Sequence, residues 1–103
     1  MLSVMNNNRL PNIHPGEILQ LDFLEPLGIT PYRLSKDIGV AQTRISEILA
    51  GKRSISPDTA IRLSRYFGNS AQFWLNLQSH YDLRQAEEDN AEAYGSITPF
   101  ATV

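Results

Sequence analysis

The fold is decided by residues 31–49, which read Pro31-Tyr-Arg-Leu-Ser-Lys-Asp-Ile-Gly-Val-Ala-Gln-Thr-Arg-Ile-Ser-Glu-Ile-Leu49. Apolar residues recur at helical spacing on both sides of a glycine: Leu34 and Ile38 before it, Ile45, Ile48 and Leu49 after it. Gly39 can supply the positive φ of a tight turn, and Ser35 is small enough for two helices to approach closely. The stretch therefore predicts a helix-turn-helix, although an αα-hairpin of a helical bundle has the same spacing.

Helix signals continue on both sides of this unit. His14-Pro15 is expected to start a first helix, with Ile18, Leu19, Leu21, Phe23 and Leu24 as its apolar face, and Pro26 and Gly28 end it. Thr30, Ser56 and Ser70 are predicted to cap the helices that follow them, whereas Ala41, before the third helix, has no capping side chain. The fourth helix is expected to bury Ala60, Ile61, Leu63 and Phe67. No stretch alternates like a strand, so we expect an all-α fold of five helices.

The apolar repeat also predicts how the chain is divided. Residues 1–12 show no periodicity and are expected to form a flexible N-terminal arm. Residues 13–86 form one domain, which suits a chain of 103 residues. Beyond residue 86 the repeat fades, and residues 87–103 are expected to be an acidic, frayed tail.

Composition excludes several classes of protein. The sequence has no cysteine, which rules out disulfides and thiol nucleophiles. No apolar run is long enough for a membrane span and the N-terminus does not look like a secretory signal, so a cytoplasmic location is expected. No nucleophile–base pair, metal-ligand set or phosphate-binding glycine loop is visible, so we expect no enzyme activity, no metal and no cofactor.

Charge is distributed unevenly. The net charge is −2, but residues 30–66 carry seven basic and three acidic side chains, a local charge of +4. From residue 82 onward, five acidic side chains face one arginine, a local charge of −4. The asymmetry fits two surfaces with different partners, although ordinary surface charge would look the same.

The exposed face of the third helix indicates contact with DNA bases. With the apolar stripe buried, five polar residues remain near its surface: Gln42, Thr43, Arg44, Ser46 and Glu47. Glutamine can pair with adenine and arginine with guanine, threonine can touch a thymine methyl, and glutamate can accept from cytosine. Such side chains at the start of a helix are suited to the major groove.

Phosphate contacts are expected next to that helix. Lys52, Arg53 and Ser54 follow it in a loop and offer two cations and a hydroxyl, and Arg33 could reach a flanking phosphate. Such contacts give affinity and register rather than sequence choice. The aromatic and apolar residues of the fifth helix, Phe73, Trp74, Leu77 and Tyr81, are expected to form core or a dimer interface rather than a base-stacking platform.

Residues 12–86 resemble a known family. Residues 29–67 are similar to lambda-repressor-like (XRE) helix-turn-helix proteins, a broad group. The His14-Pro-Gly-Glu start and the segment Phe73-Trp-Leu-Asn-Leu-Gln78 are similar to the narrower HigA antitoxin group, also called virulence-associated protein I. Ala41 departs from the Ser or Thr that many relatives have there.

The resemblance implies a bacterial type II toxin–antitoxin role. Such antitoxins bind a toxin, typically a messenger-RNA nuclease of the HigB type, and repress their own operon as homodimers on palindromic double-stranded DNA. By family position, Gln42, Thr43 and Arg44 match the base-reading start of the recognition helix, and Lys52 and Arg53 match the phosphate-contact loop. A stand-alone repressor, using the fifth helix only for dimerisation, remains the alternative. The toxin could be held by the acidic C-terminal segment or by the first helix and N-terminal arm.

Overall fold

The computed structural model describes residues 10–101, and within that range every regular element is a helix. The helices are α1 Pro15–Ile18, η2 Leu19–Leu24, α2 Glu25–Leu27, α3 Pro31–Ile38, α4 Gln42–Leu49, α5 Pro57–Phe67, α6 Ala71–Asp89 and α7 Ala91–Gly95. The expected all-α fold is confirmed. The predicted arm, residues 1–12, lies largely outside the described residues.

The first three elements form one continuous helix with a wide turn inside it. Leu19–Leu24 is a π-helix, and the N–H of Glu25 donates to Gln20 O, five residues back. Pro26 follows at once, and a proline there has no N–H for the carbonyl of Asp22 and would crowd it in an ordinary helix. The predicted first helix is therefore correct in extent, but the sequence did not show its wide turn.

Local caps start the later helices as predicted. The hydroxyls of Thr30, Ser56 and Ser70 accept hydrogen bonds from the third backbone N–H beyond them, at 3.1, 3.3 and 3.0 Å. α4 begins after Ala41 without a side-chain cap, so its first turn depends on backbone hydrogen bonds and on packing.

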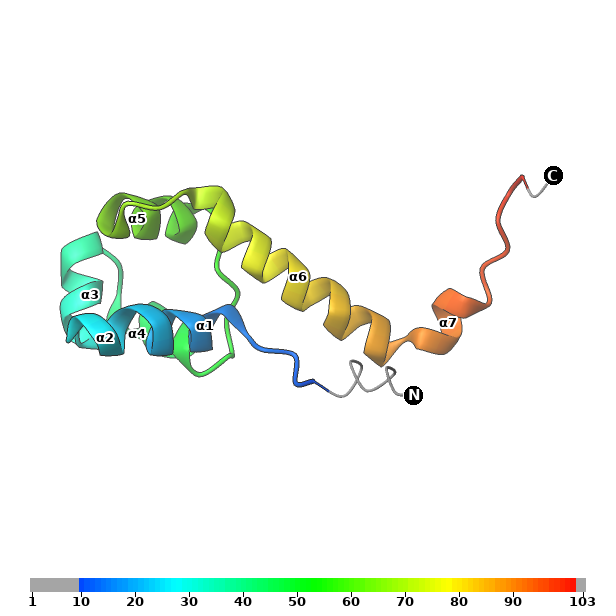
Figure 1. The fold of residues 1–103 in the computed structure, drawn as a ribbon, viewed down its shortest axis with the longest axis horizontal. Coiled ribbons are helices and arrows are strands. Elements are labelled where there is room, and N and C mark those ends of the chain that lie inside the picture. The colour runs from blue at the N-terminus through cyan, green and yellow to red at the C-terminus, as the bar shows by residue number, and fades with distance from the viewer. Residues whose placement is uncertain (1–9, 102–103) are drawn as a thin grey trace.

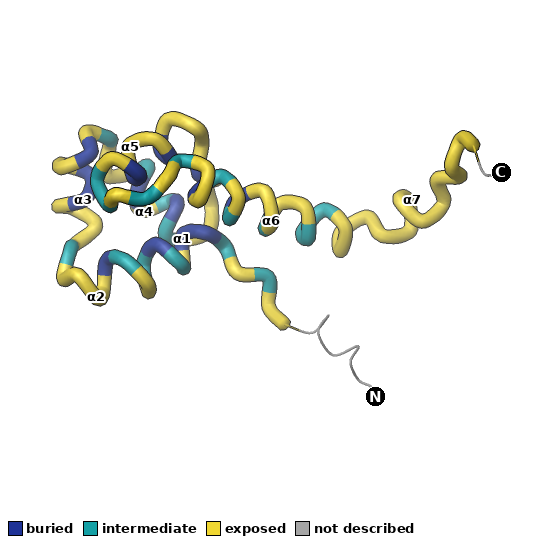
Figure 2. The backbone as a smooth tube through the Cα atoms, turned by 45° about the horizontal axis from the view of Figure 1, so that its top comes forward, coloured by how far each residue is buried: buried dark blue, intermediate teal, exposed yellow. Residues whose placement is uncertain are grey.

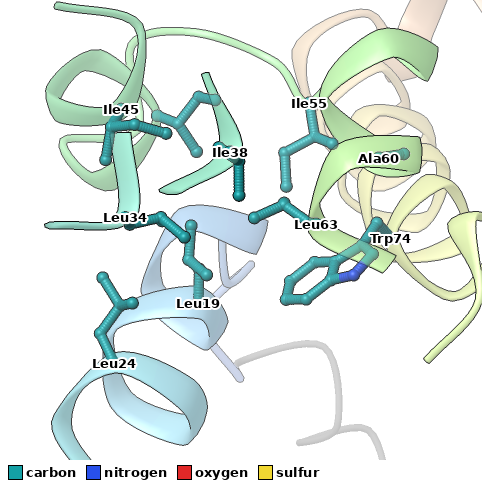
Figure 3. Close-up of a cluster of buried hydrophobic side chains, with 10 residues drawn as sticks. Leu19, Leu24, Leu34, Ile38, Ile45, Ile55, Ala60, Leu63 and Trp74 are labelled. Atoms are coloured by element: carbon teal, nitrogen blue, oxygen red, sulfur yellow. The ribbon is translucent and has the colours of Figure 1, made fainter. Parts of the chain in front are cut away.

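One apolar core joins α1 to α6. Figure 3 shows side chains from every one of the longer helices converging on it, with Leu63 and Trp74 fully buried and Ile55 contributed by the loop before α5. Gln78 of α6 is also buried, and its Oε1 accepts from the N–H of Ile55 at 2.8 Å. That bond attaches the loop after α4 to α6.

Two predicted core residues are on the surface instead. Leu21 is 50% exposed and Ile61 is 48% exposed. Leu21 lies two residues after the buried Leu19 and therefore on the opposite side of the helix. In α5 the side chains of Ala60 and Leu63 face the core, and Ile61, between them in the chain, points away from it.

The C-terminal end extends away from the core. Figure 1 shows α6 projecting from the cluster of α1–α5, with α7 at its far end, and the described chain measures 54 × 33 × 23 Å. Residues 87–101 are all exposed, as Figure 2 shows. The sequence predicted a frayed tail here, whereas the structure continues α6 to Asp89 and adds α7. Within residues 10–101 no helix is both long enough and apolar enough to cross a membrane.

Candidate nucleic-acid interface

The helix pair α3–α4 is joined by a turn of defined geometry at the end of the molecule opposite α7 (Figure 1). Gly39 has φ +74°, and the N–H groups of Gly39 and Val40 both donate to Ser35 O at 3.0 Å. Ser35 is buried, and its hydroxyl donates to Tyr32 O at 2.7 Å, so the serine leaves no unpaired group where the helices approach. The predicted helix-turn-helix is therefore present in the fold.

The side chain of Arg62 braces this turn from α5. Its Nη1 donates to Ile38 O at 2.8 Å and to Gly39 O at 3.4 Å, which satisfies carbonyls at the C-terminus of α3. Its Nε binds Asp58 at 3.1 Å. Arg62 is one of the seven basic residues of the 30–66 segment, and no contact was predicted for it. Its i, i+4 spacing to Asp58 is typical of an ion pair, but the contact with Ile38, 24 residues away, has no local signal in the sequence.

The outward face of α4 presents three of the predicted base-reading residues together. Gln42, Thr43 and Ser46 are exposed and line one shallow surface groove with Pro31 and Tyr32 of α3. Ser46 Oγ donates back to Thr43 O at 3.2 Å. Gln42 and Thr43 thus lie free at the start of the helix, where a reading helix meets base edges.

The other two predicted base-reading residues face neighbouring side chains. Arg44 is turned toward α5, where its Nη1 donates to Asp58 Oδ2 at 2.7 Å and to Thr59 Oγ1 at 3.3 Å. Its side chain is only 31% exposed. Glu47 is bound by Arg53 from the loop, with the two side chains 2.8 Å apart. Each side chain is paired with an oppositely charged neighbour, and base contact would require each to leave its partner.

The residues predicted to contact phosphates also divide into two that form ion pairs and two that are exposed. Arg33 pairs with Asp37 at 3.2 Å and Arg53 with Glu47. Lys52 and Ser54 are exposed, and Lys52 has no ion pair within residues 10–101. The N–H of Lys52 donates to Glu47 O at 2.8 Å and that of Gly51, φ +75°, to Ile48 O at 3.0 Å, so the backbone carrying Lys52 is fixed to the end of α4.

Two carboxylates of this surface, Asp58 and Asp37, have a lowered pKa. The hydrogen bond from Arg44 lowers the pKa of Asp58, and Arg62 adds to that effect. The phenol of Tyr66 donates to Asp37 Oδ2 at 2.6 Å, and this bond lowers the pKa of Asp37, with Arg33 contributing. The pairs of Arg44 with Asp58 and of Arg33 with Asp37 therefore persist at neutral pH.

Of the four residues expected to form core or a dimer interface, Trp74 lies in the core. Trp74 is 0% exposed, its ring lies 4.9 Å from that of Phe23, and its indole N–H donates to Asn69 Oδ1 at 3.0 Å. It belongs to the core because α1–η2 and α5 pack around it. Phe73, 37% exposed, and the partly buried Leu77 and Tyr81 remain accessible.

Within residues 10–101 no group of three His, Asp or Glu side chains could hold a metal ion.

Comparison with known proteins matches the chain to a family and to solved structures. The helix-turn-helix family model matches residues 22–74. Virulence-associated protein I of Dichelobacter nodosus is 47% identical over 92% of this chain and 87% of its own length. Antitoxin HigA-1 of Vibrio cholerae is 37% identical over 77% of this chain and 74% of its own. The structure of the Pseudomonas aeruginosa antitoxin HigA with the higBA promoter is 43% identical, with a TM-score of 0.85 over 88% of this chain and 100% of that chain.

Proposed function

Because the chain belongs to the helix-turn-helix family and, within it, to the group of virulence-associated protein I and HigA antitoxins, we propose that it is a DNA-binding antitoxin that represses its own operon. The family binds DNA and is not a family of enzymes. The similarity to an antitoxin whose structure was solved with promoter DNA extends over 88% of this chain and 100% of that chain. The cytoplasm, where operon DNA is found, is the location that this function requires.

The observation that carries the DNA half is the exposed start of α4. Gln42 and Thr43 lie beside the N-terminus of α3 with their side chains free, so α4 can enter the major groove with these residues at base edges. Lys52, Arg53, Ser54 and Arg33 then flank the groove as phosphate contacts. A homodimer on a palindrome would place its two copies of α4 about 34 Å apart, one turn of the duplex.

A glutamine pair tests this assignment. Gln42→Ala is expected to lower the affinity for a duplex selected by the protein from a random library by about 1–3 kcal/mol, and to relax the preference at one base pair. Gln72→Ala is the matched control, because Gln72 is an exposed glutamine of α6 that bonds only to Asn76 in its own helix. Equal affinities of the two variants in an anisotropy titration would remove α4 from the interface.

The antitoxin half requires a protein partner, and the family points to a messenger-RNA nuclease of the HigB type. Co-expression with the product of the adjacent reading frame tests it. A stable complex that relieves growth arrest is the expected result. A non-toxic neighbour that does not bind would leave the stand-alone repressor as the function, with the DNA assays unaffected.

A further inference from the structure

The turn His14-Pro15-Gly16 has no role in the function proposed above, yet it contacts the DNA-facing unit directly. His14 is the N-cap of α1: its Nδ1 accepts a hydrogen bond from the N–H of Gly16 at 2.9 Å. Pro15 and Gly16 are buried, although the segment stands at the start of the described chain. Two contacts show what this turn holds.

The first contact is a close approach of α1 to the last turn of α4. A Cβ atom added to Gly16 would lie 1.8 Å from Ile48 O and 3.1 Å from Leu49 Cα. Only glycine permits this distance between the two backbones. The carbonyl of Ile48 is also the acceptor for the N–H of Gly51, which begins the loop that carries Lys52.

The second contact is made by the His14 ring. A Cβ added to Gly51 would lie 3.8 Å from Cγ of His14, so the ring lies against the backbone of that glycine. On its other side the ring meets Tyr81 of α6 edge-on, with centroids 4.9 Å apart. Asn12 Nδ2 donates to Tyr81 O at 3.0 Å, which holds the segment leading into His14 on α6. His14 therefore lies between α6 and the loop after α4.

We propose that His14 is a positioning residue of the DNA interface: its uncharged imidazole caps α1, seats that helix against the end of α4 and thereby fixes Lys52 where it meets a phosphate. The inference rests on the proposed DNA binding. Lys52 is bonded through its N–H to Glu47 O, so the backbone of Lys52 moves with the turn that His14 and Gly16 support. His14 itself contacts no DNA.

Protonation of His14 would undo this arrangement. A protonated Nδ1 carries a hydrogen and cannot accept from Gly16, and a positive ring at the N-terminus of α1 opposes the helix dipole. Burial lowers the pKa of His14, while the charge of Asp82 on α6 acts in the opposite direction. On the elements that pack against the ring, the other charged or titratable groups are Glu17 in α1, Tyr81 in α6 and Lys52, which follows Gly51 in the loop.

The first experiment measures binding to a duplex of arbitrary sequence as a function of salt, because phosphate contacts do not depend on sequence. His14→Ala is expected to reduce the slope of log affinity against log salt by about one, as Lys52→Ala does, because each lost phosphate contact removes about 0.9 from the slope. The double variant should then be no weaker than Lys52→Ala alone. Independent, additive effects of the two substitutions would overturn the proposal.

The second experiment is a pH profile with rescue, which also decides the matter if His14→Ala does not fold. Asparagine caps helices well and does not titrate in this range, so His14→Asn should keep most of the affinity and lose its dependence on pH between about 5 and 7.5. His80→Ala, which removes the other histidine from an exposed site on α6, should keep the wild-type profile. Identical profiles for wild type and His14→Asn would refute the role of His14. No binding by the wild type to any duplex would instead refute the proposed function, and the inference with it.

Discussion

Substitution of Gly16 by alanine tests the joint between α1 and α4 most directly. The added Cβ would lie 1.8 Å from Ile48 O, and ordinary contact begins at 3.4 Å, so the two backbones must separate by the difference of about 1.6 Å. Overpacking of this kind typically costs about 1–3 kcal/mol, and here both sides of the contact are backbone, which cannot rotate away. Alanine's better helix propensity returns at most about 1 kcal/mol.

The expected net loss is therefore up to about 2 kcal/mol of the free energy of unfolding, the upper end of the overpacking range less the gain in helix propensity. For a domain of this size a loss of about 2 kcal/mol corresponds to a fall of about 8–16 °C in Tm, measured by circular dichroism of the helix signal. Gly95→Ala is the control, because Gly95 is also helical and a Cβ there meets nothing within 4 Å. That variant should keep the wild-type Tm. A Gly16→Ala protein as stable as wild type, or more stable, would show that helix propensity outweighs the contact and that the close approach does not constrain α4.

Three further outcomes follow from the same contacts. Arg44→Ala should lower operator affinity by about 1–3 kcal/mol, whereas Asp58→Asn should raise affinity for any duplex, because it releases Arg44 and removes a negative charge near phosphates; anisotropy titration measures both. The pKa of His14 is lowered in the folded protein, so the unfolded chain binds more protons below pH 6.5. Urea unfolding should therefore show that the stability of the wild type falls as the pH drops through that value, and that His14→Asn lacks this fall. Residues 87–103 carry four acidic and no basic side chains, so their removal should weaken binding to a basic toxin and leave DNA affinity unchanged. A matching loss of DNA affinity would mean that the segment supports the fold.

Features set by neighbouring residues in the chain were predictable. The caps at Thr30, Ser56 and Ser70 were predicted correctly because a capping hydroxyl acts on a backbone N–H only three residues away. The glycine turn at Gly39 was predictable for the same reason, since a positive φ at a helix C-terminus excludes most other residues.

Features set by distant contacts were not predictable from the sequence. An aromatic residue on a helix looks the same whether it faces the core or a partner, and Trp74 is core only because Phe23 and Phe67 come against it from other helices. The wide turn of η2 had only Pro26 as a signal in the sequence. The place of His14 at the start of the first helix was expected, but its hydrogen bond with the N–H of Gly16 and its contact with Gly51 were not.

Of these features, the orientation of the Arg44 side chain matters most for the proposed function. It is set by Asp58, which lies 14 residues later in the chain. A free arginine would bind any phosphate or guanine within reach. An arginine already bonded to a charged carboxylate must exchange that partner, and the exchange is favourable only where the DNA offers a better one. Arg33 and Arg53 face the same condition at Asp37 and Glu47, whereas Lys52 does not. In the proposed interface, Lys52 would therefore contact the phosphates of any duplex, whereas Arg44 would have to exchange Asp58 for a base, so discrimination between sequences would depend on Arg44 and not on the phosphate contacts.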